Sequence, residues 1–553
     1  MTVTEDRTGA GDPRRVDAGE GDRDRLGSAR SPLGTDAGGA HLPALRDRLV
    51  PPLPATGPLW WLSVLVITAI AGLLRFWDLG RPHSFVFDET YYAKDAWSLL
   101  NHGVERNYPE GADATILKGD TRIWEATGSF IVHPPLGKWM IALGEAVFGM
   151  DPVGWRVVTA LCGTVLVLVM ARLVRRLTRS NLLPLLAALL MAVDGLAIVE
   201  SRTALLDSLL AFWLVLGAAA LLVDRDRTRA RLAEEVTADP QRGLGGGPRA
   251  GWRPWRLVAG VCFGLACSTK WNGVFLLAVA GVLAVLWDVG ARRAVGVRRP
   301  WWSALRLDAA PAFFSLVGTS VVVYTASWSG WFATSSGYDR QWGMTNAPSA
   351  VSRLFPTALR SWWHYHAEML NFNTGLRTPH PYQSDPIGWL LMVKPVAFAY
   401  TGSLPGNGSG CATNCTRAIH ALGTPALWWG GVAALVVCAW LWLAGRDWRA
   451  GFALAGVLGT WVPWLFFAKR TIFSFYAIAT LPFLVIAVVL VIGTVLDRVR
   501  AHRGRSMPWV VAACGVFVVL VVVDSGFLYP VLTDQLIPYD AWRSRMWFAS
   551  WIG

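Results

Sequence analysis

Long apolar runs alternate with short polar segments through most of the chain. The runs are roughly 17–25 residues long, and they lack the one-sided 3.6-residue period of a helix on a protein surface. A helix that is apolar on every face over about 20 residues can cross a hydrocarbon core of about 30 Å. The pattern predicts eleven transmembrane helices, at 59–77, 155–174, 182–200, 204–223, 255–270, 272–290, 309–328, 425–444, 450–468, 472–495 and 508–529.

The short loops between these runs are rich in arginine. Four clusters follow predicted spans two, four, six and ten: Arg172, Arg175, Arg176 and Arg179; Arg225, Arg227, Arg229 and Arg231; Arg292, Arg293, Arg298 and Arg299; Arg498, Arg500, Arg503 and Arg505. All of them fall on one side if the N-terminus is cytoplasmic, as the positive-inside rule requires. Two long segments, 78–154 and 329–424, then lie on the extracytoplasmic face of a multi-pass cell-membrane protein.

Four regions follow from this topology. Residues 1–50, rich in Gly, Asp and Arg, are predicted to be a disordered cytoplasmic tail. Without a cleavable signal peptide, the first span serves as the targeting signal. Residues 51–330 form a transmembrane module with the first outer loop, 78–154; residues 331–424 form a second outer loop, and 425–553 a four-span C-terminal module.

Composition agrees with a membrane protein: 53% of the residues are hydrophobic and only 16% are charged. The 31 tryptophans often end apolar runs, as interfacial residues do. The net charge of +13 comes from the cytoplasmic arginines, so we expect membrane lipids and no nucleic acid as partners. The cysteines show no metal-ligand spacing, but Cys411 and Cys415 could form a disulfide if their loop is outside the cell.

The first outer loop begins with an acidic pair beside aromatic residues, Asp88 and Glu89 in the sequence FDETYYAK. In one interpretation Asp88 is the N-cap of an amphipathic helix ending at Gly103, with Glu89 favoured by the helix dipole. In the other, a carboxylate at the membrane edge is a general base that deprotonates a hydroxyl nucleophile.

Cationic residues on the same face suggest a site for an anion. His133 and Lys138 lie in the predicted turn FIVHPPLGK. This turn could bind a phosphate, or it could be a rigid re-entrant turn whose lysine extends to the membrane interface. The outer ends of the spans add Arg156, Arg202, Lys270 and Arg470. The structural alternative is mutual pairing, for example of Arg202 with Asp207, whereas a cationic cavity at the membrane surface suits a lipid phosphate.

Four blocks in order, FDETYYAKDAWSLL, IVHPPLGKWMIALGE, ESRTALLDSLLAFW and GLACSTKWNGVF, resemble the protein O-mannosyltransferases of glycosyltransferase family 39. The later block WWHYHAEMLNFNTGLRTPHPYQSDPIGWLLMVKP resembles the bacterial, actinobacterial branch. The resemblance implies an all-α polytopic GT-C fold. Segment 329–424 is too short for the β-trefoil MIR domain of eukaryotic members, so acceptor selection is expected to differ.

The resemblance also implies a reaction: inverting transfer of mannose from polyprenyl-phosphate mannose to Ser/Thr hydroxyls of unfolded exported proteins, with the export machinery as a partner. Asp88 would be the general base, and Glu89 would position the acceptor or the base. Arg156 would bind the donor phosphate, His133 and Lys138 would line the same cavity, and Arg202, Lys270 and Arg470 would add positive charge. No metal cluster is predicted, although Asp88 with Glu89 could hold a divalent cation.

Two other functions fit parts of the pattern. A GT-C enzyme acting on a cell-envelope lipid or glycan would share the same face and the same charges. A transporter or flippase would instead carry inverted repeats and charges near the membrane midplane, whereas this sequence shows no repeat and most of its motif charges lie at one edge of the membrane.

Overall fold

The computed structural model describes residues 44–244, 246–406, 411–501 and 507–552. The predicted tail therefore lies outside the described residues up to residue 43. Its last residues form a short helix, α1 (Leu45–Leu49), and Arg229 Nε of α9 donates a hydrogen bond to the Leu49 carbonyl over 3.3 Å. Residues 45–49 were predicted to belong to the disordered tail, so ordered structure begins a few residues before the predicted boundary at residue 50.

Long apolar helices dominate the described part of the chain and confirm a multi-pass membrane protein. Nine helical segments there are long and apolar enough to cross a membrane: α2 (Pro58–Phe76), α6 (Pro152–Thr178), α9 (Leu206–Ala238), α12 (Gly273–Ala294), the stretch Pro300–Ser327 from α13 to α15, α19 (Pro425–Leu443), the stretch Trp448–Phe467 that begins with α20, α21 (Leu481–Ala501) and α22 (Met507–Leu532).

Two of the eleven predicted spans take a different form. Span 182–200 is a bent pair, α7 (Leu183–Val193) and α8 (Gly195–Arg202), with an angle of 58° between them. Asp194 lies at the break, where Oδ1 accepts a hydrogen bond from Ala197 N (3.0 Å) and Oδ2 accepts one from Trp428 Nε1 (2.8 Å). This buried carboxylate therefore caps the second half of a broken helix.

The predicted span 255–270 is α11 (Pro254–Thr269), with 16 residues. At 1.5 Å per residue it is about 24 Å long, less than the hydrocarbon core of about 30 Å. Among the described residues, the number of full-length spans is therefore nine, or ten with the bent pair, rather than eleven.

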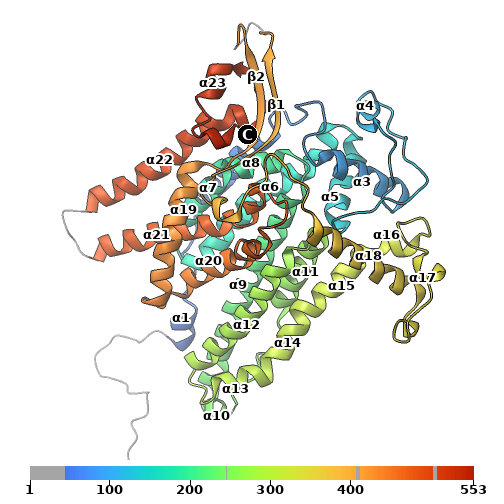
Figure 1. Cartoon of the computed structure of the whole chain (residues 1–553). Helices are drawn as coiled ribbons and strands as arrows, with labels where there is room; N and C mark the ends of the chain where they lie inside the picture. Colours follow the sequence, from blue (N-terminus) through green and yellow to red (C-terminus); the bar gives the residue numbers. More distant parts are fainter. Residues whose placement is uncertain (1–43, 245, 407–410, 502–506, 553) are drawn as a thin grey trace, which may run out of the picture. The chain divides into compact units, whose positions relative to one another are not determined.

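The two long segments between the spans carry most of the remaining elements. The first contains α3 (Glu89–His102), α4 (Ala112–Ile116) and α5 (Leu136–Phe148). The second contains α16 (Ser329–Ala333), α17 (Trp342–Thr345), α18 (Thr357–Gly375) and the antiparallel strands β1 (Val396–Leu404) and β2 (Cys415–Ala421). In Figure 1, α3, α4, β1 and β2 lie at the opposite end of the helices from α10 (Gln241–Leu244) and α13 (Pro300–Ala304).

The small sheet departs from the all-α prediction. A third strand, β3 (Ile537–Pro538), pairs with β2, so that the C-terminal residues join the second long segment. The structure also decides the question of the two loop cysteines, because Cys411 and Cys415 form a disulfide at the start of β2.

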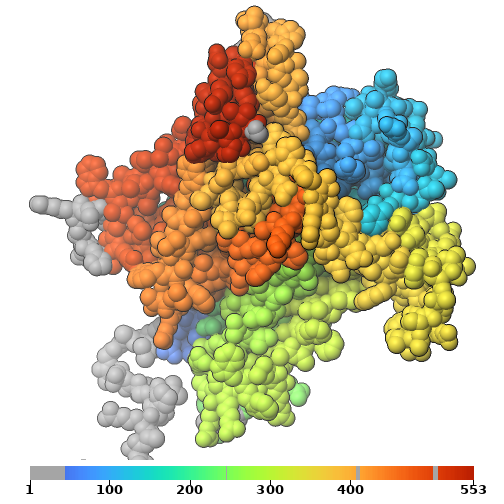
Figure 2. Space-filling view, viewed as in Figure 1, coloured from blue at the N-terminus to red at the C-terminus, as the bar shows by residue number. Residues whose placement is uncertain are grey.

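The two long segments contact each other directly. The backbone N–H of Ile131 donates to Tyr365 Oη over 2.9 Å, and Asn373 Nδ2 donates to the Val132 carbonyl over 3.1 Å. Figure 2 shows the blue and cyan first segment beside the yellow part of the second. Helix α18 therefore lies against the turn that carries His133, as expected if both segments lie on one side of the membrane.

Candidate active site

Asp88 lies immediately before α3 (Glu89–His102), and this helix ends at Gly103, which has a φ of +75°. The predicted helix is confirmed, including its glycine terminus. Asp88 occupies the predicted N-cap position, but its side chain accepts no hydrogen bond from the first turn of the helix. Oδ2 instead faces Tyr92 Oη at 3.5 Å, so the carboxylate is available to other groups.

The surroundings of Asp88 make its carboxylate more basic than an ordinary aspartate. Burial raises the pKa of Asp88 to about 6; the positive charge of Lys270 partly offsets this effect, and the Asp207 carboxylate adds to it. At neutral pH such a group is still mostly ionised, yet it holds a proton more strongly than an exposed aspartate. Both properties suit a group that must accept a proton.

Glu89 is fully buried, and its carboxylate is saturated with hydrogen bonds. Arg156 donates to both of its oxygens, from Nε over 2.8 Å and from Nη2 over 2.7 Å. The backbone N–H groups of Val86 and Ala204 add two more bonds, each 2.9 Å long. Four donors fill the acceptor sites of the two oxygens. Glu89 is thus placed to hold the Asp88 backbone in position, and it has no free acceptor for a substrate or a metal ion.

The same observation bears on a cation between Asp88 and Glu89. A divalent cation would need a carboxylate oxygen from each residue, but the Glu89 oxygens already bind a guanidinium and two backbone N–H groups. The acidic pair therefore does not fit a metal site.

Arg156 is also fully buried, and every one of its N–H groups is used. Besides Glu89 it donates to three carbonyl oxygens between the end of α2 and α3: Leu79 (3.2 Å), Pro82 (3.0 Å) and Ser84 (2.9 Å). A guanidinium has five N–H donors, and all five are occupied. The expected role of Arg156 as a phosphate ligand is therefore not supported; it ties α6 to the loop that leads to Asp88.

Arg202 has a similar structural arrangement. Its guanidinium donates to carbonyl oxygens at and beyond the end of α2, those of Leu74, Arg75, Trp77 and Asp78. These are the carbonyls that a helix end leaves without partners. Neither the phosphate role nor the suggested ion pair with Asp207 describes this residue, which caps a transmembrane helix.

Lys138 is buried and lies between two carboxylates. Its Nζ is 2.8 Å from Glu105 and 3.3 Å from Asp95. It therefore neither reaches the interface nor offers a free charge to a ligand. The lysine joins α5 to α3 and to the residues that follow α3.

Three predicted cations remain near Asp88. Lys270 Nζ binds both oxygens of Asp207, at 2.9 and 2.8 Å, and lies 4.1 Å from the centre of the Tyr476 ring. Burial and the charges of Lys270 and Arg470 lower the pKa of His133 well below its ordinary value, so this imidazole is neutral. The structure thus brings Asp88, His133, Lys270 and Arg470 into one electrostatically connected group.

Arg470 keeps unused hydrogen-bonding capacity. Its Nη2 donates to Asn373 Oδ1 on α18 over 3.1 Å, while its enclosed Nε has no partner among the described residues. A half-buried guanidinium with a free N–H can bind an anion, as the saturated Arg156 cannot.

Glu200, on α8, is a candidate that our sequence interpretation did not select. It is fully buried, and neither of its oxygens has a hydrogen-bond partner among the described residues. It interacts electrostatically with Asp207, Lys270 and Asp88. One feature of the sequence could have identified Glu200: it lies at the end of an apolar run, where a carboxylate usually faces a binding site or a charged partner. The break at Asp194, which sets the direction of α8, is visible only in the structure.

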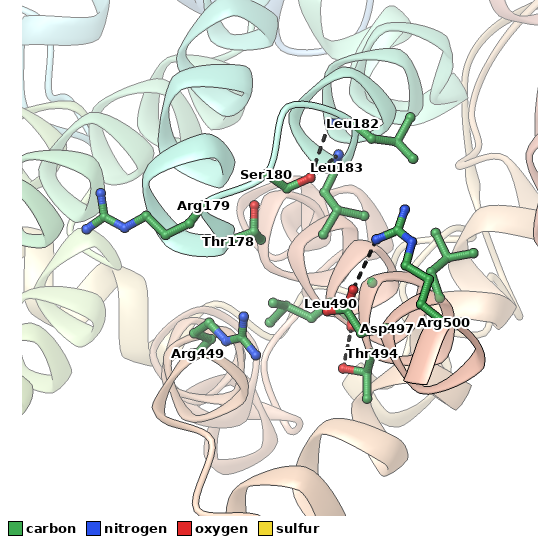
Figure 3. A pocket seen from close by; sticks show the side chains of 12 residues that line it. Thr178, Arg179, Ser180, Leu182, Leu183, Arg449, Leu490, Thr494, Asp497 and Arg500 are labelled. Atoms are coloured by element: carbon green, nitrogen blue, oxygen red, sulfur yellow. Dashed lines mark hydrogen bonds and ion pairs between the residues drawn. The ribbon is translucent and has the colours of Figure 1, made fainter. Parts of the chain in front are cut away.

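A separate cavity of about 200 Å³ lies at the far end of α6 (Figure 3). It is lined by parts of α20 and α21 and by Thr178, Arg179, Ser180, Leu182 and Leu183. Thr178 is about 33 Å from Arg156 along the helix at 1.5 Å per residue. The three arginines that line the cavity are paired, Arg179 with Asp226, Arg449 with Asp447 and Arg500 with Asp497. The cavity is remote from Asp88 and is not part of the candidate site.

A model of the dolichyl-phosphate-mannose-protein mannosyltransferase family matches residues 65–327, and a model of the C-terminal four-transmembrane region of protein O-mannosyltransferases matches residues 358–551. The chain belongs to the protein O-mannosyltransferase family. It is 38% identical to a polyprenol-phosphate-mannose–protein mannosyltransferase of Mycobacterium tuberculosis, over 90% of this chain and 94% of the relative. A relative of the same name from Mycolicibacterium smegmatis is 36% identical over 94% of this chain and 98% of its own length.

The protein O-mannosyltransferase fold is also found by structural comparison. A chain of the Pmt1–Pmt2 protein O-mannosyltransferase complex of S. cerevisiae, solved with the sugar donor bound, superposes with a TM-score of 0.67 at 13% identity. The match covers 92% of this chain and 94% of the yeast chain. This confirms the predicted GT-C fold of the protein O-mannosyltransferases.

Proposed function

We propose that Asp88 is the general base with which this protein mannosyltransferase transfers mannose from polyprenyl-phosphate mannose to Ser/Thr hydroxyls of acceptor proteins. The observation that carries this proposal is the position of Asp88. It is a half-buried carboxylate with a pKa raised to about 6, within the electrostatic reach of Lys270 and held by the saturated Glu89–Arg156 pair. The names of the full-length relatives supply the donor and the class of acceptor.

The proposed reaction requires one proton acceptor. Asp88 Oδ takes the proton of the acceptor hydroxyl while the hydroxyl oxygen forms a bond to the anomeric carbon of mannose. The bond from this carbon to the phosphate oxygen breaks, and polyprenyl phosphate leaves with the electron pair. Attack opposite the leaving group inverts the anomeric configuration. No acid need protonate the leaving phosphate if cations stabilise its charge.

We assign the phosphate to the side of the site that holds Arg470, Lys270 and His133. Arg470 has a free N–H, and the neutral imidazole of His133 can donate one hydrogen bond. The charge of Lys270 is partly balanced by Asp207, which lowers its net attraction for an anion. Arg470 is therefore the main phosphate ligand in this proposal.

We assign Glu200 to the sugar. Its two oxygens lack partners among the described residues, although it interacts with Asp88, Asp207 and Lys270. A buried carboxyl without partners is costly unless a ligand or water supplies hydrogen bonds. Hydroxyl groups of the transferred mannose would do so.

We further propose that the N-terminus is cytoplasmic and that the site faces the outside of the cell membrane. The arginine clusters support this orientation through the positive-inside rule, because their described members lie at the ends of the helices away from Asp88. Unfolded exported proteins are then the acceptors, and contact with the export machinery would present them before they fold.

The test is transfer of radiolabelled mannose from polyprenyl-phosphate mannose by the purified full-length chain in detergent. We expect incorporation into a Ser/Thr-containing peptide and none into the same peptide with alanine at those positions. Label that enters only an added lipid or glycan acceptor would support the alternative GT-C function. Uptake of substrate into proteoliposomes without any transfer would support the transporter instead.

A further inference from the structure

Asp339, His364 and Glu368, all in the second long segment, form a cluster that is separate from the Asp88 site. Asp339 lies between α16 and α17, while His364 and Glu368 lie four residues apart on one face of α18. One ligand atom from each of the three residues lies within 4.8 Å of the other two. This group could not be predicted from the sequence, because Asp339 is 25 positions from His364 and no cysteine is involved.

Hydrogen bonding does not account for the arrangement. His364 Nε2 is 3.4 Å from an oxygen of Asp339 and 3.4 Å from an oxygen of Glu368. One ring nitrogen carries at most one proton, so it cannot donate to both carboxylates, and both distances exceed those of a good hydrogen bond. The other oxygen of Glu368 is enclosed, and the nearby Tyr338 hydroxyl interacts with this carboxylate.

The ring of His364 is held in place. Trp342 of α17 stacks on it with ring centres 4.0 Å apart and an angle of 9° between the planes. The imidazole Nε2 is therefore held between two carboxylates. This geometry is that of a set of metal ligands, in contrast to a flexible ion pair on the surface.

From these three residues we infer a binding site for a divalent cation of the Zn²⁺ class. Ligand atoms at about 2.1 Å from a tetrahedral Zn²⁺ lie about 3.4 Å from one another, and this is the 3.4 Å separation of Nε2 from each carboxylate oxygen. One imidazole and two carboxylates favour Zn²⁺ over Ca²⁺, which prefers oxygen ligands alone. Water would occupy the fourth position.

The position on α18 indicates what the cation would do. The residue after His364, Tyr365, accepts the hydrogen bond from Ile131, and Asn373 farther along the helix binds both Val132 and Arg470. A cation bound by Asp339, His364 and Glu368 would fix α18 to the preceding loop. We assign it a structural role, that of a clamp holding the helix whose far end contacts the phosphate side of the site.

The first experiment uses the full-length chain in detergent, freed of metal with a chelator and then titrated with Co²⁺. We expect one Co²⁺ per chain with a visible absorption band of a low-symmetry, four-coordinate ion, and displacement of Co²⁺ by one equivalent of Zn²⁺. We also expect the melting temperature to rise on loading. Absence of a saturable Co²⁺ spectrum would overturn the proposal whether or not mannose is transferred.

The second experiment places the ion. His364→Gln, Glu368→Gln and Asp339→Asn each remove one ligand, and we expect each to weaken Co²⁺ binding by more than 100-fold, because loss of an outer-shell partner alone costs about 10–100-fold. His83→Gln and Asp120→Asn alter exposed residues of the first segment and serve as matched controls with unchanged affinity. Unchanged binding in the three ligand variants would place the ion elsewhere and refute the site.

Discussion

Replacing Arg156 by alanine separates two accounts of this residue. If Arg156 binds the donor phosphate, the variant should fold normally and require more donor. In the structure, however, its five N–H groups bind Glu89 and the carbonyls of Leu79, Pro82 and Ser84. Arg156→Ala would leave the buried Glu89 carboxylate with two backbone donors and no counter-charge.

The size of the effect follows from this burial. Removing one partner of a buried ion pair costs about 3–5 kcal/mol, because the remaining charge stays uncompensated. We therefore expect Arg156→Ala to lower the melting temperature by several degrees and to reduce kcat, since the loop before Asp88 loses its attachment to α6. In the double variant Glu89→Gln with Arg156→Ala no buried charge is left unpaired, so part of the lost stability should return.

The assay combines thermal unfolding in detergent with initial rates over a range of donor concentrations. Lys469→Ala is a suitable control, because Lys469 is exposed on the same outer turn as Arg470. A variant Arg156→Ala with the melting temperature of the parent chain and a KM for the donor raised tenfold or more would refute the structural role and restore the phosphate role.

Three further predictions concern the proposed reaction. Asp88→Asn should reduce turnover by at least 1,000-fold while donor binding is retained. In the parent chain kcat/KM should fall as the pH drops below about 6, because protonation of Asp88 removes the base. Equal turnover of Asp88→Asn and Asp120→Asn would contradict this role of Asp88. Arg470→Ala should raise the KM for the donor about tenfold, which equal donor titrations of this variant and Lys469→Ala would exclude. Glu200→Gln should weaken use of the donor sugar without changing the affinity for polyprenyl phosphate alone, as measured by competition; equal loss of both would point to a general packing defect.

Sequence was sufficient for the parts of the fold that depend on hydrophobicity alone. The apolar runs predicted the spans, and Gly103 predicted the end of the helix that follows Asp88. The bend at Asp194 and the short α11 were not predictable in this way, because a break with a satisfied cap leaves the hydropathy of the run unchanged. The small sheet was also missed, since β3 consists of two residues far along the chain from β1 and β2.

The residues of the site were predicted from sequence by their charge. Charge alone does not distinguish a residue that stabilises the fold from one that binds a ligand. Arg156, Arg202 and Lys138 look like Arg470 in sequence, yet the donors of Arg156, the Nη groups of Arg202 and the ammonium of Lys138 are bound by carbonyls or carboxylates. Of these four residues, only Arg470 has an enclosed N–H without a partner among the described residues. A buried cation with every donor occupied stabilises the chain, whereas an enclosed donor or acceptor left open gains stability only when something binds there. The same criterion selects Glu200 near Asp88, but it also marks other buried groups such as Glu145 and Arg256. Open hydrogen-bonding capacity therefore indicates a ligand only where it coincides with the other residues of a site.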